Sequence, residues 1–445
     1  MTDVNDELAG LRSFLDASPS PFHAVTTASG LLDAAGFTPL DETETWATSV
    51  GRRYVTRGGS LVAWSLDDPE QLDGGFRLIG AHTDSPNLRI KPRPDTGRAG
   101  YRQLAVEVYG GVLLNSWLDR DLGLSGRVVV RGGTTGSVVH LVRIDRPLLR
   151  IPQLAIHLDR GVNENGLILN PQQHLAPVWG LGPVDEGGLR AVLADELGIA
   201  PVEVLSWDLM LHDLTPATLL GRSDELLSSA RLDNLLSSFA AVDALVRTTA
   251  PGAAVRPGVP VVCLFDHEEI GSETSTGAAG SLITTITERI AATATATDPT
   301  TAAAAGDVAR DRYLRALARS RCVSADGAHA THPNYAERHE PGHHIAMNQG
   351  PVIKINANMR YATDATSSAW FKLVCERAGV PVQEFVVRSD MGCGSTIGPI
   401  TSARLGIPTV DVGVAQLSMH STRELCGAHD PAYFTRALTE FLSGH

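Results

Sequence analysis

The sequence predicts a discontinuous α/β domain, with a mixed sheet flanked by helices, that is interrupted by a β-rich insertion. Three observations predict this fold class. Helical patterns alternate with apolar, strand-like runs after residue 231, which is typical of an α/β sheet. Residues 95–230 instead contain many short Val-rich runs separated by Gly turns. Finally, a chain of 445 residues is long for one hydrophobic core, which favours two domains.

The N-terminal part contains one helical pattern and two strand-like runs. Apolar residues at three- and four-residue steps predict an amphipathic helix that stops before Pro19 and Pro21. These apolar residues are Leu8, Leu11, Phe14 and Leu15. The runs LVAWSL and FRLIG, on either side of the polar turn DDPEQLDGG, predict two strands of a buried sheet. The second strand leads directly into the motif GAHTDSP.

The C-terminal part has the alternation that defines the α/β domain. A helix is predicted from apolar residues that share one face, namely Leu232, Leu235, Leu236, Phe239 and Val242. The runs VPVVCLF, VQEFVV and IPTVDVG, bounded by Gly and Pro, predict buried strands. We therefore assign residues 1–93 and 231–445 to the α/β domain and residues 94–230 to the insertion.

Composition and charge limit the classes of partner. Thirty-seven basic and fifty acidic residues give a formal charge of -13, which disfavours nucleic acid and anionic membrane surfaces as partners. No apolar run approaches the roughly 20 residues that a membrane-spanning helix needs. The five cysteines form no CxxC pair, and the N-terminus lacks a secretion signal, so we expect a cytoplasmic protein.

Two motifs place acidic and imidazole side chains directly after predicted strands. His82 and Asp84 lie in GAHTDSP, where the alternative is a turn whose Asp and Ser bond the backbone. Glu268 and Glu269 stand side by side in DHEEIGS, after the strand VPVVCLF. Adjacent carboxylates can divide two tasks, because one can bind a metal while the other accepts a proton from a metal-bound water.

Three further segments carry residues of the same types. Asp233 opens a helix in ARLDNL, where a carboxylate that favours the helix dipole is the simpler interpretation. Asp326 lies in SADGAHATHPNY with His329 and His332 nearby, and His420 lies in QLSMHS. Each of these residues alone has a structural explanation, so only their combination can indicate a metal site.

Together these residues offer two imidazoles and three carboxylates, a donor set that suits zinc, cobalt or manganese. The five are His82, Asp233, Glu269, Asp326 and His420. Five ligands imply two metal ions that share one carboxylate. Between two ions about 3.5–4 Å apart, a bridging water becomes acidic enough to attack an amide without a protein nucleophile.

Nine motifs in one order resemble the aspartyl aminopeptidases, a family of dinuclear zinc exopeptidases. They are SPSPFHAV, GAHTDSP, PQLAIHLDR, ARLDNL, DHEEIGS, SADGAHATHPNY, VIKINANMRY, CGSTIGPI and QLSMHS. The resemblance covers nearly the whole chain. It implies a metallo-aminopeptidase that removes Asp or Glu from the N-terminus of peptides, with residues 1–93 and 231–445 as the catalytic domain and residues 94–230 as an oligomerisation domain.

The resemblance also implies roles for the site residues. It makes the five residues above the ligands of two zinc ions, with Asp233 bridging them. Glu268 is then the general base that acts on the bridging water, and Asp84 orients His82 from behind. His157, in the insertion, is implied to reach the active site of a neighbouring subunit, and the family assembles as a dodecamer built from dimers.

Lys354 is the cation expected at the acidic side chain of the substrate, because the net charge of the chain opposes such a substrate. Alone, Lys354 reads equally well as a lysine at a strand edge. Two positions depart from the family pattern: Gly392 stands where a proline is usual, and Met359 where a glutamine is usual. Both departures could change the shape of the substrate pocket, so they bear on which N-terminal residue is preferred more than on the class of reaction.

Three other functions remain open from the sequence. A related dinuclear peptidase could act on neutral N-termini, in which case Lys354 would have no role. A two-metal site could also hydrolyse N-acyl groups or phosphoesters. A non-catalytic protein on the same scaffold would be expected to lose Glu268 or a ligand, and the chain retains them all.

Overall fold

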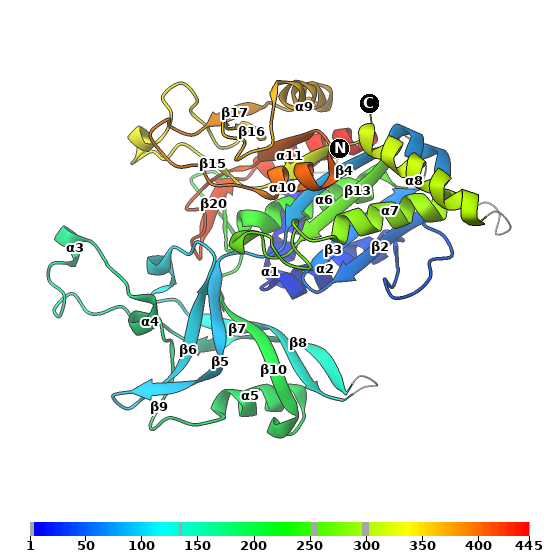
Figure 1. Cartoon of the computed structure of the whole chain (residues 1–445). Coiled ribbons are helices and arrows are strands. Elements are labelled where there is room, and N and C mark those ends of the chain that lie inside the picture. The colour runs from blue at the N-terminus through cyan, green and yellow to red at the C-terminus, as the bar shows by residue number, and fades with distance from the viewer. Residues whose placement is uncertain (1–3, 133–135, 251, 253–256, 296–301, 445) are drawn as a thin grey trace.

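A computed structural model of the chain describes residues 4–132, 136–250, 252, 257–295 and 302–444 (Figure 1). Three sheets are formed by these residues: one of nine strands, one of six and one of five. Helices flank the nine-stranded sheet, and the six-stranded sheet projects from it as a separate layer. The predicted α/β fold class, with a mixed sheet and flanking helices, is confirmed.

The nine-stranded sheet is parallel at its centre, where β13, β4, β14 and β18 lie side by side. The strands in spatial order are β1 (Thr38–Pro39), β2 (Gly51–Arg57), β3 (Ser60–Leu66), β13 (Val259–Phe265), β4 (Phe76–His82), β14 (Arg321–Ala325), β18 (Thr409–Gly413), β16 (Val352–Ile355) and β17 (Gln383–Val386). Every residue of β13 is buried, as expected for a parallel strand covered on both faces.

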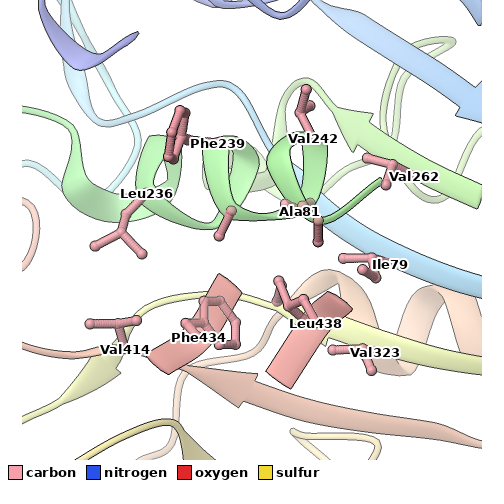
Figure 2. Close-up of a cluster of buried hydrophobic side chains, with 14 of the residues drawn as sticks. Ile79, Ala81, Leu236, Phe239, Val242, Val262, Val323, Val414, Phe434 and Leu438 are labelled. Atoms are coloured by element: carbon pink, nitrogen blue, oxygen red, sulfur yellow. The ribbon is translucent and has the colours of Figure 1, made fainter. Parts of the chain in front are cut away.

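Helices cover both faces of this sheet. Side chains alternate between the two faces along each strand, so apolar strands present apolar side chains to the helices on both faces. Ile79 of β4 packs into one apolar core and Leu78 into the other. The first core holds α1 (Val4–Ala17), α2 (Pro21–Ala34), α6 (Leu232–Thr248), α9 (Ala365–Ala378) and α11 (Asp430–Ser443). The second holds α7 (Leu282–Thr295), α8 (Ala302–Ala318) and α10 (Ile397–Leu405). Figure 2 shows Phe239 of α6 and Phe434 of α11 in the first core.

The predicted N-terminal helix is found as α1, and a second helix, α2, which the sequence analysis did not predict, begins at Pro21. Pro21 is the first residue of α2, where its missing N–H costs no hydrogen bond. Ser20 caps this helix by accepting the backbone N–H of His23. A proline pair can therefore separate two helices and does not always end helical structure.

The six-stranded sheet is antiparallel and carries its own apolar core, against which α5 (Gly188–Leu197) packs. In spatial order its strands are β8 (Ser137–Leu149), β7 (Leu122–Arg131), β10 (Val204–Asp213), β5 (Asn87–Arg98), β6 (Tyr101–Tyr109) and β9 (Val178–Leu181). The sheet thus starts before residue 94 and ends before residue 230. The domain boundaries expected from the sequence stay a prediction.

Two smaller features complete the arrangement. The five-stranded sheet runs in the order β11 (Thr218–Leu220), β12 (Leu226–Ser229), β20 (Glu424–Gly427), β19 (Ala415–Leu417) and β15 (Ala328–His329). Between β8 and β9, an arm with the short helices α3 (Val162–Asn165) and α4 (Pro171–His174) extends from the six-stranded sheet (Figure 1).

In the part of the chain that the structure describes, every helix is too short or too polar to cross a bilayer.

Candidate metal centre and its surroundings

The site lies at the carboxyl ends of the central parallel strands, where open α/β sheets place their functional groups. His82 is the last residue of β4, and Asp326 directly follows β14. Glu268 and Glu269 lie in a short 3-10 turn after β13. Asp233, the second residue of α6, faces them across the same edge.

The five expected ligands form two groups that share Asp233. His82 Nε2 lies 3.4 Å from Asp233 Oδ1 and 3.4 Å from Asp326 Oδ1. His420 Nε2 lies 3.4 Å from Asp233 Oδ2 and 3.4 Å from Glu269 Oε1. The Asp233 carboxylate therefore presents one oxygen to each group. Donor atoms about 2.0–2.1 Å from a tetrahedral ion are about 3.3 Å apart, so this spacing suits a metal ion better than hydrogen bonds.

Buried donor atoms without hydrogen-bond partners support this interpretation. Asp233 Oδ1 and Glu269 Oε1 are both buried and accept no hydrogen bond in the described part of the chain. A buried carboxylate oxygen without a partner is costly unless a cation binds it. Imidazole nitrogens together with carboxylate oxygens are the donors that zinc prefers. The residues present therefore fit a divalent metal, and zinc in particular.

The electrostatics of the protein alone show the same need for a cation. Burial raises the pKa of Glu268 to about 8, with the carboxylate of Asp326 adding to the effect. Burial and then Asp233 raise the pKa of Glu269 well above its usual range. Burial would lower the pKa of His420, but the Asp233 carboxylate 3.4 Å away and the charge of Glu269 raise it to about 10. Carboxylates crowded in this way repel one another until a bound ion compensates their charge.

Asp84 lies behind the first ligand group, next to His82. Its carboxylate lies 3.4 Å from His82 Nδ1, while its own carbonyl oxygen lies closer to that nitrogen, at 3.0 Å. It also accepts the backbone N–H groups of Glu268 and Glu269, each at 3.1 Å. Burial opposes the charge of Asp84, but the His82 imidazole, 3.4 Å from the carboxylate, keeps the pKa of Asp84 below the ordinary value.

Glu424 is a supporting residue that the sequence analysis missed. Its buried carboxylate accepts the backbone N–H of Asp233 at 2.9 Å and that of His420 at 2.7 Å. Glu424 therefore joins two ligand-bearing segments that are far apart in the sequence. Its only sequence signal was its position four residues after His420, in the motif SMHSTREL.

Lys354 lines the same pocket as the ligands, but its ammonium is already engaged. Lys354 Nζ donates to Asp326 Oδ2 at 3.3 Å and to the Gly327 carbonyl at 3.0 Å. The side chain is 2% exposed, and its ammonium lies 5.1 Å from the centre of the Tyr361 ring. His329 lines this pocket too, which gives it a place beside the site that the sequence left open.

His157 is not brought to this pocket within one subunit. It is an exposed residue of the arm, in a turn after β8, and is absent from the described residues that line the pocket. The arm around it exposes large apolar side chains, namely Leu154, Ile156, Leu158, Leu167 and Ile168. A role for His157 at the active site of a neighbouring subunit stays a prediction.

The chain matches known proteins over almost its full length. The profile of a family described as aminopeptidase I zinc metalloprotease (M18) matches residues 14–442. A probable M18 family aminopeptidase 2 of Streptomyces coelicolor is 53% identical over 433 residues, covering 97% of this chain and 96% of that protein.

Solved structures are similar over comparable lengths. A chain in the complex of Ape4 and Nbr1 superposes with a TM-score of 0.91 at 36% identity, covering 99% of this chain and 86% of that one. A chain of the yeast mApe1 dodecamer superposes with a TM-score of 0.82 at 30% identity, covering 98% and 97%.

Proposed function

This chain belongs to the M18 family of zinc metalloproteases and is a metal-dependent aminopeptidase, and we propose that its substrates are peptides with an N-terminal Asp or Glu. One observation carries the proposal: Lys354 is a buried cation that lines the pocket beside the ligand groups. An ion bound to Asp326 would compensate that carboxylate. The charge of Lys354 would then be available to an acidic side chain in the pocket.

We propose two metal sites, most simply occupied by zinc, with cobalt or manganese as alternatives. His82 and Asp326 would hold one ion, His420 and Glu269 the other, and Asp233 would bridge them, in keeping with the distances between their donor atoms. When bound, the ions polarise the scissile carbonyl and lower the pKa of a water molecule. Asp84 and Glu424 hold the ligand-bearing segments from outside.

We assign the general base to Glu268. Its carboxylate is 15% exposed and lines the pocket, and its Oε2 lies 4.0 Å from His82 Nε2, beside the ligand groups. From this position Glu268 can accept a proton from the attacking water and deliver it to the leaving amine. The backbone N–H of Glu268 donates to Asp84, which fixes the position of the Glu268 backbone from which this side chain extends.

We further propose that the enzyme assembles as a dodecamer built from dimers, in which the arm of one subunit brings His157 to the active site of another. The exposed apolar side chains of the arm support burial against a second copy. The related yeast mApe1 is a dodecamer. All five cysteines are free thiols, which supports a reducing compartment such as the cytoplasm.

The test is release of the N-terminal residue from matched peptides that start with Asp, Glu, Ala or Leu. Each assay runs with and without a chelator, followed by add-back of zinc, cobalt or manganese. We expect chelator-sensitive cleavage of the Asp and Glu peptides alone. Lys354→Met should abolish this preference, whereas Lys372→Met, at an exposed lysine of α9, should leave it unchanged.

A second candidate is an aminopeptidase for neutral or varied N-termini, and one observation favours it. The hydrogen bonds of Lys354 to Asp326 and Gly327 could be its whole role. In that case the Ala and Leu peptides would be cleaved as readily as the Asp peptide, and Lys354→Met would lower all rates alike.

A further inference from the structure

The end of strand β6 brings the six-stranded sheet into contact with the metal centre. Tyr109, the last residue of β6, donates its hydroxyl proton to Asp84 Oδ2 at 2.7 Å. The next residue, Gly110, packs so closely on Glu269 that a Cβ atom there would lie 3.1 Å from the Glu269 Cβ. Gly111 follows, and its carbonyl lies 2.9 Å from His420 Nδ1. One short segment therefore contacts Glu269 and His420 of the second ligand group directly, and reaches the first group only through Asp84.

Asp84 makes the Tyr109 contact consequential, because the same carboxylate has three other neighbours. It faces His82 Nδ1 and accepts the backbone N–H groups of Glu268 and Glu269. Tyr109 and the Glu269 N–H both donate to Oδ2, whereas the Glu268 N–H donates to Oδ1. Loss of the hydroxyl would remove the shorter of the two hydrogen bonds to Oδ2 and leave the carboxylate held only by the two backbone N–H groups, which fixes its angle to His82 less firmly.

The ring of Tyr109 is itself held in place. Its side chain is buried, and the guanidinium of Arg89, on the paired strand β5, lies 3.7 Å above the ring centre. The His267 ring lies on another side, with centres 6.4 Å apart. Burial and the charge of Asp84 raise the pKa of Tyr109 far above its ordinary value, so the hydroxyl remains a proton donor at any working pH.

We propose that Tyr109 is a positioning residue of the metal centre, which acts by fixing the Asp84 carboxylate against His82 and against the backbone of Glu268 and Glu269. The inference rests on the proposed metal sites and on Glu268 as the base. It makes the six-stranded sheet part of the support of the centre. Residues that contact a metal ligand directly, as Asp84 contacts His82, typically change metal affinity or activity about 10–100-fold when removed, and Tyr109 acts one contact further out.

The experiment compares Tyr109→Phe, which keeps the ring and its stacking, with Tyr101→Phe at the exposed start of the same strand. Zinc affinity is measured by competition with a chelator, and the cobalt-loaded proteins are compared by their visible absorption spectra. We expect Tyr109→Phe to weaken zinc binding by about tenfold, the lower end of that range, to shift the cobalt spectrum and to lower kcat with little change in KM. Tyr101→Phe should match the wild type in all three.

Asp84→Asn gives a second, independent test. If Tyr109 acts through Asp84, Asp84→Asn must also weaken zinc binding, and the double variant must lose little beyond Asp84→Asn alone. Unchanged zinc affinity in Tyr109→Phe or in Asp84→Asn would overturn the inference, as would losses that simply add. Zinc affinity is independent of substrate, so a wild-type protein without aminopeptidase activity would refute the proposed function and leave this test valid.

Discussion

Glu268→Gln gives the sharpest test of the proposed chemistry, because this carboxylate lies beside the ligand groups, close enough to His82 and Glu269 that the test must tell a base from a ligand. Gln has nearly the same size, and the backbone N–H that bonds Asp84 remains. All five proposed ligands also remain. The variant should therefore fold, assemble and bind two zinc ions per chain as the wild type does, while losing its proton acceptor.

The expected loss follows from the role of the residue. General base catalysis contributes about 10²–10⁴-fold to a rate, which corresponds to about 2.7–5.4 kcal/mol of transition-state stabilisation. We expect kcat to fall by this factor, with little change in KM, because Glu268 is not assigned to substrate binding. The pH profile should change too: wild-type activity should fall as pH drops and Glu268 becomes protonated. Burial places its pKa near 8 without metal, and a bound ion lowers it.

The assay measures kcat, KM and zinc content of purified protein with an Asp peptide between pH 5.5 and 9. The matched control is Glu273→Gln, an exposed carboxylate five residues along the same loop. It should behave as the wild type. The reasoning would be refuted if Glu268→Gln kept more than a tenth of wild-type kcat at full zinc occupancy. Loss of zinc from this variant would instead assign Glu268 to the ligands.

Three other predictions test the assembly and the fold. His157→Phe should lower activity while zinc content stays at the wild-type level, whereas His140→Phe, at an exposed histidine of β8, should change neither; full activity of His157→Phe would remove that residue from the site. Phe434→Ala should lower the free energy of unfolding by about 3–5 kcal/mol in urea titrations, because the ring is fully buried in the core that Figure 2 shows, and a loss below 1 kcal/mol would contradict that packing. Burial, followed by the charge of Arg143, lowers the pKa of His23 in the folded chain to about 4. Because His23 takes up a proton near pH 6.5 only when the chain is unfolded, the folded state should lose stability as pH falls from about 6.5 to 4. His23→Gln should therefore reduce the drop in Tm between pH 7.5 and pH 5 in thermal unfolding, and an unchanged drop would assign the pH dependence to other groups.

The part of the site that the sequence could predict lies in motifs that follow strands. His82, Glu269 and Asp326 each come at or just after a strand that is apolar enough to recognise, and parallel strands bring their carboxyl ends to one edge. The geometry groups these residues with Asp233 and His420, as the sequence analysis expected. Their roles as ligands remain a proposal that zinc binding must test.

The supporting residues were beyond such reasoning, because they depend on contacts between distant segments. Glu424 bonds the backbone of Asp233, 191 positions away, and nothing local marks its carboxylate as buried. Tyr109 looks like any aromatic residue at the end of a strand, and only the packing of two sheets places its hydroxyl on Asp84. Helix α2 was missed for a local reason, since Pro21 was taken as a stop where it is a start.

The position of the insertion in the chain explains why Tyr109 supports the centre from the six-stranded sheet. Strand β5 begins at Asn87, only three residues after Asp84, and Asn87 pairs with Tyr109 at the base of the β5–β6 hairpin. The hairpin is thus joined to the metal centre at both strands. Strand β5 follows Asp84 closely in the chain, and the last residue of β6, Tyr109, donates its hydroxyl proton to Asp84. The same sheet carries the arm with His157. The arm that is proposed to contact a neighbouring subunit and the strand whose tyrosine contacts Asp84 therefore belong to one sheet.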